Sequence, residues 1–296
     1  MKRRLNRSII VPVLLLALLP VVLVACTEDS TGGPDPIEKS AKRGIAGNMT
    51  AAGDLDVLKS GISWWYNWGF TTGAPNGYAE TYEMDFIPML WGRNSDASIE
   101  SARDFILSHP EIEYLLVMNE PNLTGQANRL PWEAAADWLK YEDLVAELAA
   151  NGRTIKIVGP QITWGTMQGY ADPVVWMDAF YDAYRTANGG RDPQIDYLGF
   201  HWYDYGLEGQ LDRLQKYGKQ IWITEMANWN ANIDSYEKHI EQMTQMVALC
   251  ESRADVFRYA WFIARGTTFD DHHTYVLTQN TGELTELGRA YLDLPF

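Results

Sequence analysis

The 296-residue sequence contains few cysteines, since Cys26 and Cys250 are its only two. If Cys26 carries a lipid, as the pattern described below predicts, no intrachain disulfide framework is available. Cys250 falls in line with Ile240, Met243 and Val247 at helical spacing. This spacing predicts a buried and inert thiol rather than a nucleophile.

Positive charge is also scarce. The chain has 24 Lys+Arg against 39 Asp+Glu, which gives a formal net charge of −15. Residues 1–25 carry four cations and no acids, so the remainder has 20 − 39 = −19. Nucleic acids and anionic lipid surfaces attract cationic proteins, so this composition argues against both as partners of the main domain.

Phosphate-binding glycine loops are missing. No G-x-x-x-x-G-K-[ST] motif occurs, and Gly44 and Gly47 lack the spacing of a dinucleotide-binding loop. This disfavours an open doubly wound sheet. His272 and His273 follow two aspartates, but adjacent residues on an extended segment point to opposite faces and no third ligand is placed by the pattern. We therefore expect a solvated loop there, and neither a metal site nor a cofactor.

One apolar run, residues 9–24, follows a cluster of four cations at the N-terminus. Pro12 and Pro20 interrupt the run, and it is short for a membrane span. It ends in Leu-Val-Ala-Cys26, which resembles the lipobox of bacterial lipoproteins. The pattern predicts that residues 1–25 form a lipoprotein signal peptide and that Cys26 is lipidated, so that the protein is exported and tethered to a membrane. The alternative is an ordinary secretory signal or an uncleaved anchor.

Residues 26–42 are small, polar and rich in Pro and Gly, which predicts a flexible tether. The remaining residues, 43–296, match the usual size of one (β/α)8 barrel, roughly 250 residues. We expect a single domain and a monomer.

Eight short apolar segments recur along this domain, and their near-continuous apolar character is typical of parallel strands covered by helices. They are residues 43–48, 63–69, 85–92, 114–119, 155–163, 195–203, 221–225 and 256–263. Helical patterns between them cover 98–108, 131–152, 172–189, 209–217 and 235–251, with minimal helices after the first two strands. Strands alternating with helices predict an α/β fold, the (β/α)8 TIM barrel.

Two of the predicted strands end at a glutamate. In YLLVMNEPN, Glu120 is followed at once by Pro121, which cannot continue a central strand, and in IWITEMA a short apolar strand ends at Glu225. On a barrel both would lie at the carboxyl ends of strands, where active sites of this fold are built. A pair of carboxyl groups can serve as proton donor and nucleophile in the hydrolysis of a glycosidic bond. The alternative for each is an exposed or salt-bridged glutamate.

The segments RGIAGN, SWWYNWG, FIPMLWG, LLVMNEPN, DYLGFHWYD and IWITEMA resemble, in this order, those of glycoside hydrolase family 128, a family of β-1,3-glucanases in the superfamily called clan A. The resemblance implies that Glu120 is the acid/base, that Glu225 is the nucleophile of a retaining mechanism, and that Asn119 binds the sugar 2-hydroxyl. Asn122 and Met226 depart from the family's usual NEPD and TEFA, but both glutamates are unchanged.

Other residues are candidates for substrate binding. His201 and Tyr203 lie two apart on one predicted strand and should both point inward, Tyr203 toward the nucleophile and His201 toward a sugar or a carboxylate. The chain has 12 Trp and 16 Tyr, and indoles at strand ends can stack on sugar rings or, alternatively, fill the core. The expected sugar contacts are Trp65, Trp91, Trp202 and Trp261, with hydrogen bonds from Asn67, Gln161 and Arg93.

We therefore expect an exported retaining glycoside hydrolase that acts on β-1,3-glucan, with internal rather than terminal attack. One alternative is another clan A β-glycanase, such as a β-1,4-glucanase or a mannanase, because linkage preference depends on groove shape. The other is a surface glycan-binding lipoprotein that does not catalyse. We expect the loops at 123–130 and 164–172 to control the groove.

Overall fold

The structure is a computed structural model that describes residues 38–266 and 274–296. The predictions for the signal peptide, for Cys26 and for the His272–His273 pair therefore lie outside the described residues. Within the described ranges, no helix combines the length and the apolar character needed to cross a membrane.

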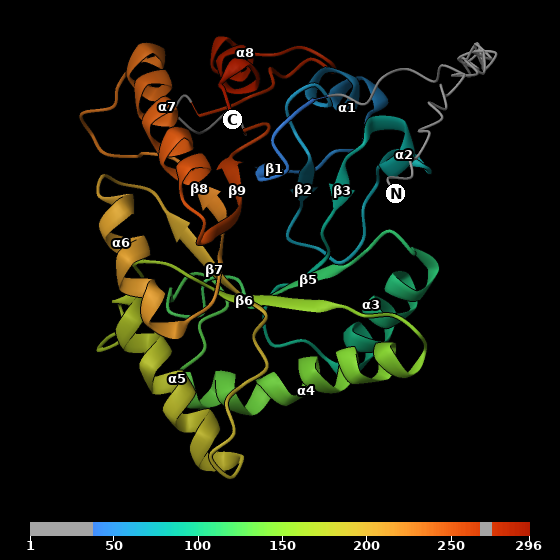
Figure 1. Ribbon diagram of the computed structural model, residues 1–296, viewed down its shortest axis with the longest axis vertical. Helices are drawn as coiled ribbons and strands as arrows, with labels where there is room; N and C mark the ends of the chain where they lie inside the picture. The colour runs from blue at the N-terminus through green and yellow to red at the C-terminus, as the bar shows by residue number, and fades with distance from the viewer. Residues whose placement is uncertain (1–37, 267–273) are drawn as a thin grey trace, which may run out of the picture. The chain divides into compact units, whose positions relative to one another are not determined.

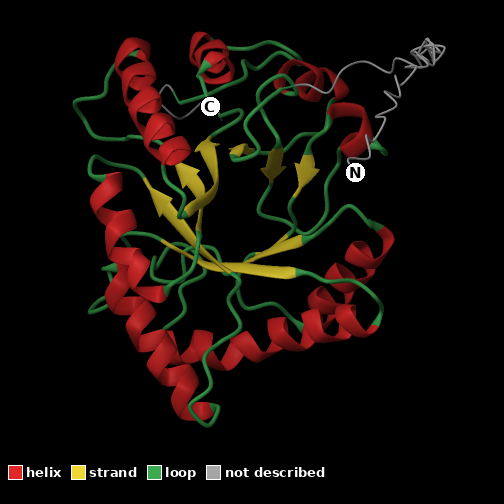
Figure 2. Cartoon of the chain, viewed as in Figure 1, coloured by secondary structure: helices red, strands yellow, loops and turns green. Residues whose placement is uncertain are grey.

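Nine strands of the described chain form one sheet, in the order β3-β2-β1-β9-β8-β7-β6-β5-β4, with every pair parallel. They are β1 (Arg43–Ala46), β2 (Trp64–Tyr66), β3 (Asp85–Phe86), β4 (Met89–Leu90), β5 (Tyr114–Val117), β6 (Lys156–Ile162), β7 (Tyr197–Trp202), β8 (Ile221–Met226) and β9 (Val256–Phe262). Figure 2 shows the strands at the centre, surrounded by helices.

The two ends of this order, β3 and β4, are neighbours in the sequence. They are the two parts of the predicted strand 85–92, divided at Pro88, whose nitrogen carries no hydrogen for the ladder. The Ile87 amide still donates to Trp65 O at 2.9 Å, and Pro88 O accepts from the Leu116 amide at 2.9 Å. This one segment therefore pairs with β2 on one side and β5 on the other. The eight predicted strands are confirmed, and they form a (β/α)8 barrel.

The helices alternate with the strands along the chain (Figure 1). They are α1 (Ala52–Leu58), α2 (Tyr78–Tyr82), α3 (Asp96–Ser108), α4 (Pro131–Ala150), α5 (Pro173–Ala187), α6 (Leu207–Leu214), the 3-10 turn η1 (Gln215–Tyr217), α7 (Tyr236–Ser252) and α8 (Glu286–Asp293). The five predicted helices are confirmed, and the two after the first strands are short, at 7 and 5 residues. Helix α8 was not predicted.

Local signals explain where the longer helices begin and end. Asp172 caps α5 by accepting a hydrogen bond from the Val174 amide at 2.9 Å, and Pro173 occupies the first turn, where its missing N–H costs nothing. Ser235 caps α7 in the same way through the Lys238 amide. Gly152 follows α4 at φ +80°, a left-handed conformation that favours glycine.

Aromatic side chains fill the amino-terminal end of the barrel. They belong to the first residues of their strands, and Trp64 and Trp222 lie with ring centroids 5.1 Å apart. The Arg258 guanidinium lies over Trp222 and Tyr114, at 5.0 and 5.1 Å from their ring centroids. This plug closes one end of the barrel, so the polar chemistry is confined to the carboxyl end.

The folded domain begins earlier than the sequence predicted. The Lys39 ammonium donates to the carbonyls of Lys59, Ile62 and Tyr82, at 2.9, 2.8 and 3.3 Å. The Lys42 ammonium likewise donates to three carbonyls around the end of α7. Residues 39–42 thus belong to the barrel, and the predicted tether boundary at residue 42 is corrected. Cys250 is fully buried, as predicted.

Candidate active site

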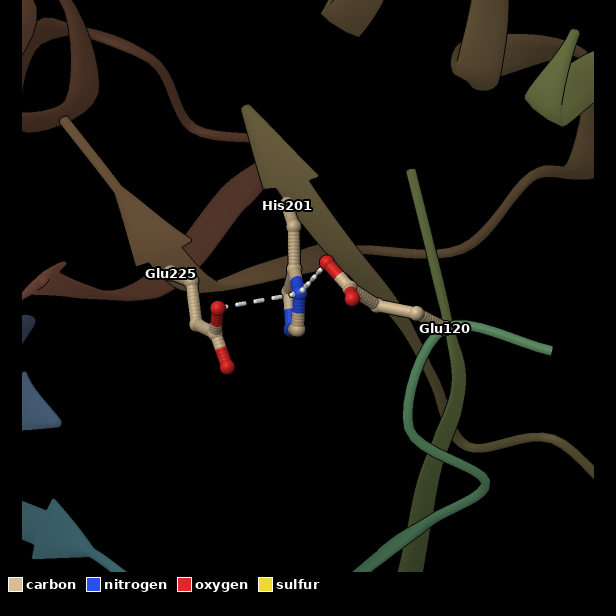
Figure 3. A group of neighbouring side chains, drawn as sticks. All are labelled: Glu120, His201 and Glu225. Carbon is tan, nitrogen blue, oxygen red and sulfur yellow. Dashed lines mark hydrogen bonds and ion pairs between the residues drawn. The ribbon is translucent and has the colours of Figure 1, made fainter. Parts of the chain in front are cut away.

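Both predicted glutamates stand at carboxyl ends of strands. Glu225 is in β8, and Glu120 lies just beyond β5, where its amide donates to Gln161 O at 2.8 Å. Met118 and Glu120 have φ of +55° and +48°, which non-glycine residues rarely adopt and which costs about 1–3 kcal/mol each. The Glu120 and Glu225 side chains extend toward one another (Figure 3).

His201, from β7, lies between the two carboxylates (Figure 3). Its Nδ1 is 2.9 Å from Glu120 Oε1 and 3.4 Å from Glu225 Oε2. One oxygen of each glutamate and a nitrogen of His201 all lie within 4.8 Å of one another. Burial lowers the pKa of His201, but the charge of Glu225 and the hydrogen bond and charge of Glu120 raise it more, so its pKa lies above its ordinary value.

Among the described residues, three side chains donate hydrogen bonds to Glu225. Tyr66 Oη and Trp68 Nε1 donate to Oε1 at 2.7 and 2.8 Å, and the Tyr203 hydroxyl donates to Oε2. Burial, and then the charge of Glu225, raise the pKa of both tyrosines well above its ordinary value, so they remain donors. Three donors hold this carboxyl group in one orientation.

The two glutamates open onto a cavity of about 420 Å³. It is lined by Trp68, Trp91, Asn119, Glu120, Leu123, Gln126, Thr163, Trp164, Tyr203, Glu225, Trp229 and Phe262. A second cavity of about 530 Å³ shares Thr163, Trp164, Tyr203 and Trp229 with the first and adds Trp202, Asp204 and Gln210. Together they form an aromatic-walled space with a pair of carboxyl groups in it, a composition that suits sugar rings.

Residues 44–291 match the family model described as glycosyl hydrolase catalytic core. A crystal structure of a glycoside hydrolase family 128 subgroup II endo-β-1,3-glucanase from Pseudomonas viridiflava is 49% identical, covers 88% of this chain and 100% of its own, and superposes with a TM-score of 0.82. The chain belongs to glycoside hydrolase family 128.

A second subgroup II endo-β-1,3-glucanase of the family, from Sorangium cellulosum, is 30% identical, with 86% of this chain and 98% of its own covered and a TM-score of 0.70. Alkali-sensitive linkage protein 1 of Schizosaccharomyces pombe is 27% identical over 263 residues, which are 86% of this chain. The chain spans 44% of that curated relative's length.

Asn119 and Trp91 line the first cavity of this family 128 hydrolase, with both glutamates and Tyr203. Asn119 is 3% exposed, and its Oδ1 has no hydrogen-bond partner among the described residues. A buried acceptor at a cavity wall is suited to a donor from a ligand. His201 does not reach the cavity, because it is fully buried beneath the two glutamates.

Three of the predicted sugar contacts need correction. Trp65 and Trp261 are fully buried between barrel and helices, where Trp261 Nε1 donates to Thr274 O at 3.0 Å, so neither can stack on a sugar. Gln161 is fully buried and bonded to Thr224. The Asn67 amide donates to Thr71 O at 2.9 Å, and Asn67 is not among the residues that line either cavity, so its sugar contact stays a prediction.

Two further predictions fall outside the first cavity. Trp202 is only 9% exposed and lines the second cavity, with its indole nitrogen donating to Tyr205 O. Arg93 is exposed and is not among the lining residues of either cavity.

The sequence interpretation missed Tyr66 and Trp68 as hydrogen-bond partners of Glu225. The two-residue alternation that placed His201 and Tyr203 on one face also separates Tyr66 and Trp68 from Trp65 and Asn67. Trp164 and Trp229 come from loops, where no periodicity exists to orient a side chain.

Within the described part of the chain, Glu120, His201 and Glu225 are the group whose donor atoms lie close enough to hold a metal ion. The same atoms are already bonded to one another and to Tyr66, Trp68 and Tyr203. These hydrogen bonds satisfy the group without an ion.

Proposed function

We propose that this hydrolase cleaves β-1,3-glucan at internal linkages with retention of anomeric configuration. The observation that carries the proposal is the pair Glu120 and Glu225, which present oxygens within 4.8 Å of one another at the cavity. The carboxyl groups of retaining enzymes are about 5–5.5 Å apart, whereas inverting enzymes leave about 6.5–9.5 Å for a water molecule. The relatives at 49% and 30% identity, both endo-β-1,3-glucanases, support the linkage and the internal attack.

In the first step Glu225 acts as the nucleophile. Its carboxylate, which is held in place by hydrogen bonds from Tyr66, Trp68 and Tyr203, attacks the anomeric carbon. The bond from that carbon to the glycosidic oxygen breaks, and Glu120 transfers its proton to the leaving oxygen. A covalent glycosyl-enzyme results.

In the second step Glu120, now ionised, takes a proton from water. The water oxygen attacks the anomeric carbon, and the bond to Glu225 breaks, which restores both carboxyl groups. The unpartnered Oδ1 of Asn119 accepts a hydrogen bond from a sugar hydroxyl, in keeping with the 2-hydroxyl contact that the family resemblance implies.

A linkage panel tests the specificity. Purified enzyme is incubated with laminarin, cellulose and mannan, and new reducing ends are measured, with Glu225→Gln as the matched inactive control. Release from laminarin alone is expected. Release of reducing ends from cellulose or mannan alone would assign another β-glycanase activity to the chain. No release from any of the three would favour the alternative of a glycan-binding protein that does not catalyse.

Two further measurements test the mechanism. Proton NMR during hydrolysis of a laminari-oligosaccharide should show the β-anomer of the product first, and initial formation of the α-anomer would exclude retention. Borohydride-reduced and branched β-1,3-oligosaccharides analysed by mass spectrometry should yield internal fragments. Release of glucose alone from chain ends would exclude internal attack.

We also propose that the protein is exported and anchored through a lipid on Cys26. The support is the lipobox-like ending of the apolar run at residues 9–24. Full-length protein expressed in a bacterium should partition into the detergent phase, whereas Cys26→Ser should not. Equal partitioning of the two proteins would contradict lipidation.

A further inference from the structure

A chain of buried hydrogen bonds runs beneath the catalytic pair, from a backbone carbonyl to the acid. Gln161 Nε2 donates to Val158 O at 2.7 Å, and Thr224 Oγ1 donates to Gln161 Oε1 at 2.6 Å. His201 Nε2 lies 2.9 Å from Thr224 Oγ1, and its Nδ1 lies 2.9 Å from Glu120 Oε1. Gln161, Thr224 and His201 are fully buried.

The chemistry of each group fixes the direction of this chain. A carbonyl oxygen only accepts, so the Gln161 group facing Val158 is the amide nitrogen and the group facing Thr224 is the amide oxygen. That oxygen also only accepts, so the Thr224 hydroxyl uses its one proton there. Thr224 Oγ1 must then accept from His201, which requires a proton on Nε2. A neutral His201 therefore presents the lone pair of Nδ1 to Glu120.

The fold provides space for this amide. A Cβ built on Gly199 of β7 would lie 2.1 Å from Gln161 Oε1, and one on Gly159 of β6 would lie 3.3 Å from Gln161 Nε2. Gln161 and Gly199 are paired across β6 and β7, next to a shift in the register. The amide thus occupies a site that a side chain at residue 199 would fill.

We propose that Gln161 and Thr224 are positioning residues that keep His201 protonated at Nε2, so that the acid's proton is held between Nδ1 of His201 and Oε1 of Glu120. This proposal rests on the proposed role of Glu120 as the proton donor. His201 and Glu120 share one proton. It lies either on Glu120, as a carboxylic acid beside a neutral imidazole, or on His201, as an imidazolium beside a carboxylate. This is the proton that passes to the leaving oxygen.

Without this chain, the other tautomer would oppose catalysis. A neutral His201 with its proton on Nδ1 would donate it to an ionised Glu120 and stabilise the carboxylate, which is the form that cannot protonate the leaving group. With Nε2 protonated, loss of the shared proton leaves a lone pair facing Glu120 and, at 3.4 Å, Glu225. Tyr66 and Tyr203, the other titratable groups here, are bonded to Glu225 and remain protonated. The shared proton is therefore retained to a higher pH than it would be with the Nδ1-protonated tautomer.

The tautomer can be observed directly and without substrate. Protein labelled with ¹⁵N-histidine is examined by long-range ¹H–¹⁵N NMR as the pH is raised, with the His201 signals assigned from His201→Gln. Nε2 is expected to carry a proton throughout, and Nδ1 to be unprotonated at alkaline pH. Thr224→Val is expected to populate the Nδ1-protonated form. A proton on Nδ1 in the neutral wild-type ring would overturn the proposal.

Kinetics then test the consequence. In Thr224→Val the alkaline limb of kcat/KM should move about one pH unit lower, the size expected for a hydrogen bond to a charged group, while Thr224→Ser, which keeps the hydroxyl, should retain the wild-type limb. At alkaline pH, Thr224→Val should lose more of its kcat/KM on laminarin than on a dinitrophenyl glycoside, because the dinitrophenyl leaving group needs no proton. Equal alkaline limbs in the two variants would refute the role of Thr224. If the wild type cleaves no β-1,3-glucan, the proposed function fails, yet NMR still decides the tautomer.

Discussion

The indole of Trp229 stacks on the ring of Tyr203, with ring centroids 4.0 Å apart and planes inclined by 23°. Phe262 meets both rings edge-on, with its centroid 5.5 Å from each. The Trp229 amide donates to Tyr203 O at 2.9 Å. Because the Tyr203 hydroxyl donates to Oε2 of Glu225, this aromatic group helps to determine where the Glu225 carboxylate points.

Tyr203→Phe keeps the stacked ring and removes the hydrogen bond to Glu225. A hydrogen bond to a charged group contributes about 1.5–3 kcal/mol, so kcat/KM on laminarin should fall about 10- to 100-fold. Tyr205→Phe is the matched control, since Tyr205 is 46% exposed and is not among the residues that line the first cavity. Wild-type kinetics in Tyr203→Phe would show that the two other donors suffice to orient Glu225.

The two glutamates should fail in different ways. Glu225→Gln is expected to abolish turnover while calorimetry still detects binding of laminarihexaose. Glu120→Gln should cost about 10² to 10⁴ in rate on laminarin, the usual contribution of a general acid. It should lose much less on a dinitrophenyl glycoside, whose leaving group departs unprotonated. If instead Glu225→Gln retained activity on the dinitrophenyl glycoside and Glu120→Gln did not, Glu225 would be the general acid and Glu120 the nucleophile.

Two tryptophans of nearly equal exposure allow a residue of the proposed binding surface to be compared with a residue outside it. Trp164 is 52% exposed and lines both cavities, whereas Trp132 is 53% exposed and is not among the residues that line either. Stacking of an indole on the face of a sugar ring contributes on the order of 1 kcal/mol or more. Trp164→Ala should therefore raise KM for laminarihexaose roughly tenfold and leave the melting temperature unchanged. Trp132→Ala should leave KM unchanged. Equal effects of both substitutions would remove Trp164 from the binding surface.

Strand positions and the two glutamates were predictable because their signals are local. An apolar run that ends at Glu120 and is stopped by Pro121 identifies a strand end without knowledge of any other residue. The same holds for the helix caps at Asp172 and Ser235. Parallel pairing then brings the strand ends together at one face of the barrel, which is why Glu120 and Glu225 meet.

The aromatic wall was not predictable in the same way. In residues 64–68, WWYNW, aromatic side chains occur on both faces of the strand, so the pattern does not say which face is inside. The structure resolves it, because Tyr66 bonds to Glu225 and Trp65 packs under the helices. The structural role of Lys39 could not be predicted either, since its three carbonyl partners come from residues up to 43 positions away.

The pH dependence of stability should reveal the proton that His201 holds. Its pKa is raised in the folded protein, because Glu225 and Glu120 outweigh the effect of burial. The folded chain therefore keeps this proton at pH values where the unfolded chain, with an ordinary pKa near 6.5, has released it. The resulting stabilisation is complete below about pH 6.5 and is lost as the pH rises through the folded-state pKa.

Urea unfolding of wild type and His201→Asn between pH 5.5 and 9 measures this effect. The difference in unfolding free energy between the two proteins should shrink as the pH rises above about 6.5. In a Glu225→Gln background the shrinkage should be weaker, because the largest of the interactions that raise the pKa has been removed. A difference that stays constant over the whole range would mean that His201 is neutral in the folded protein at every pH tested, and that the charges of Glu225 and Glu120 do not overcome its burial.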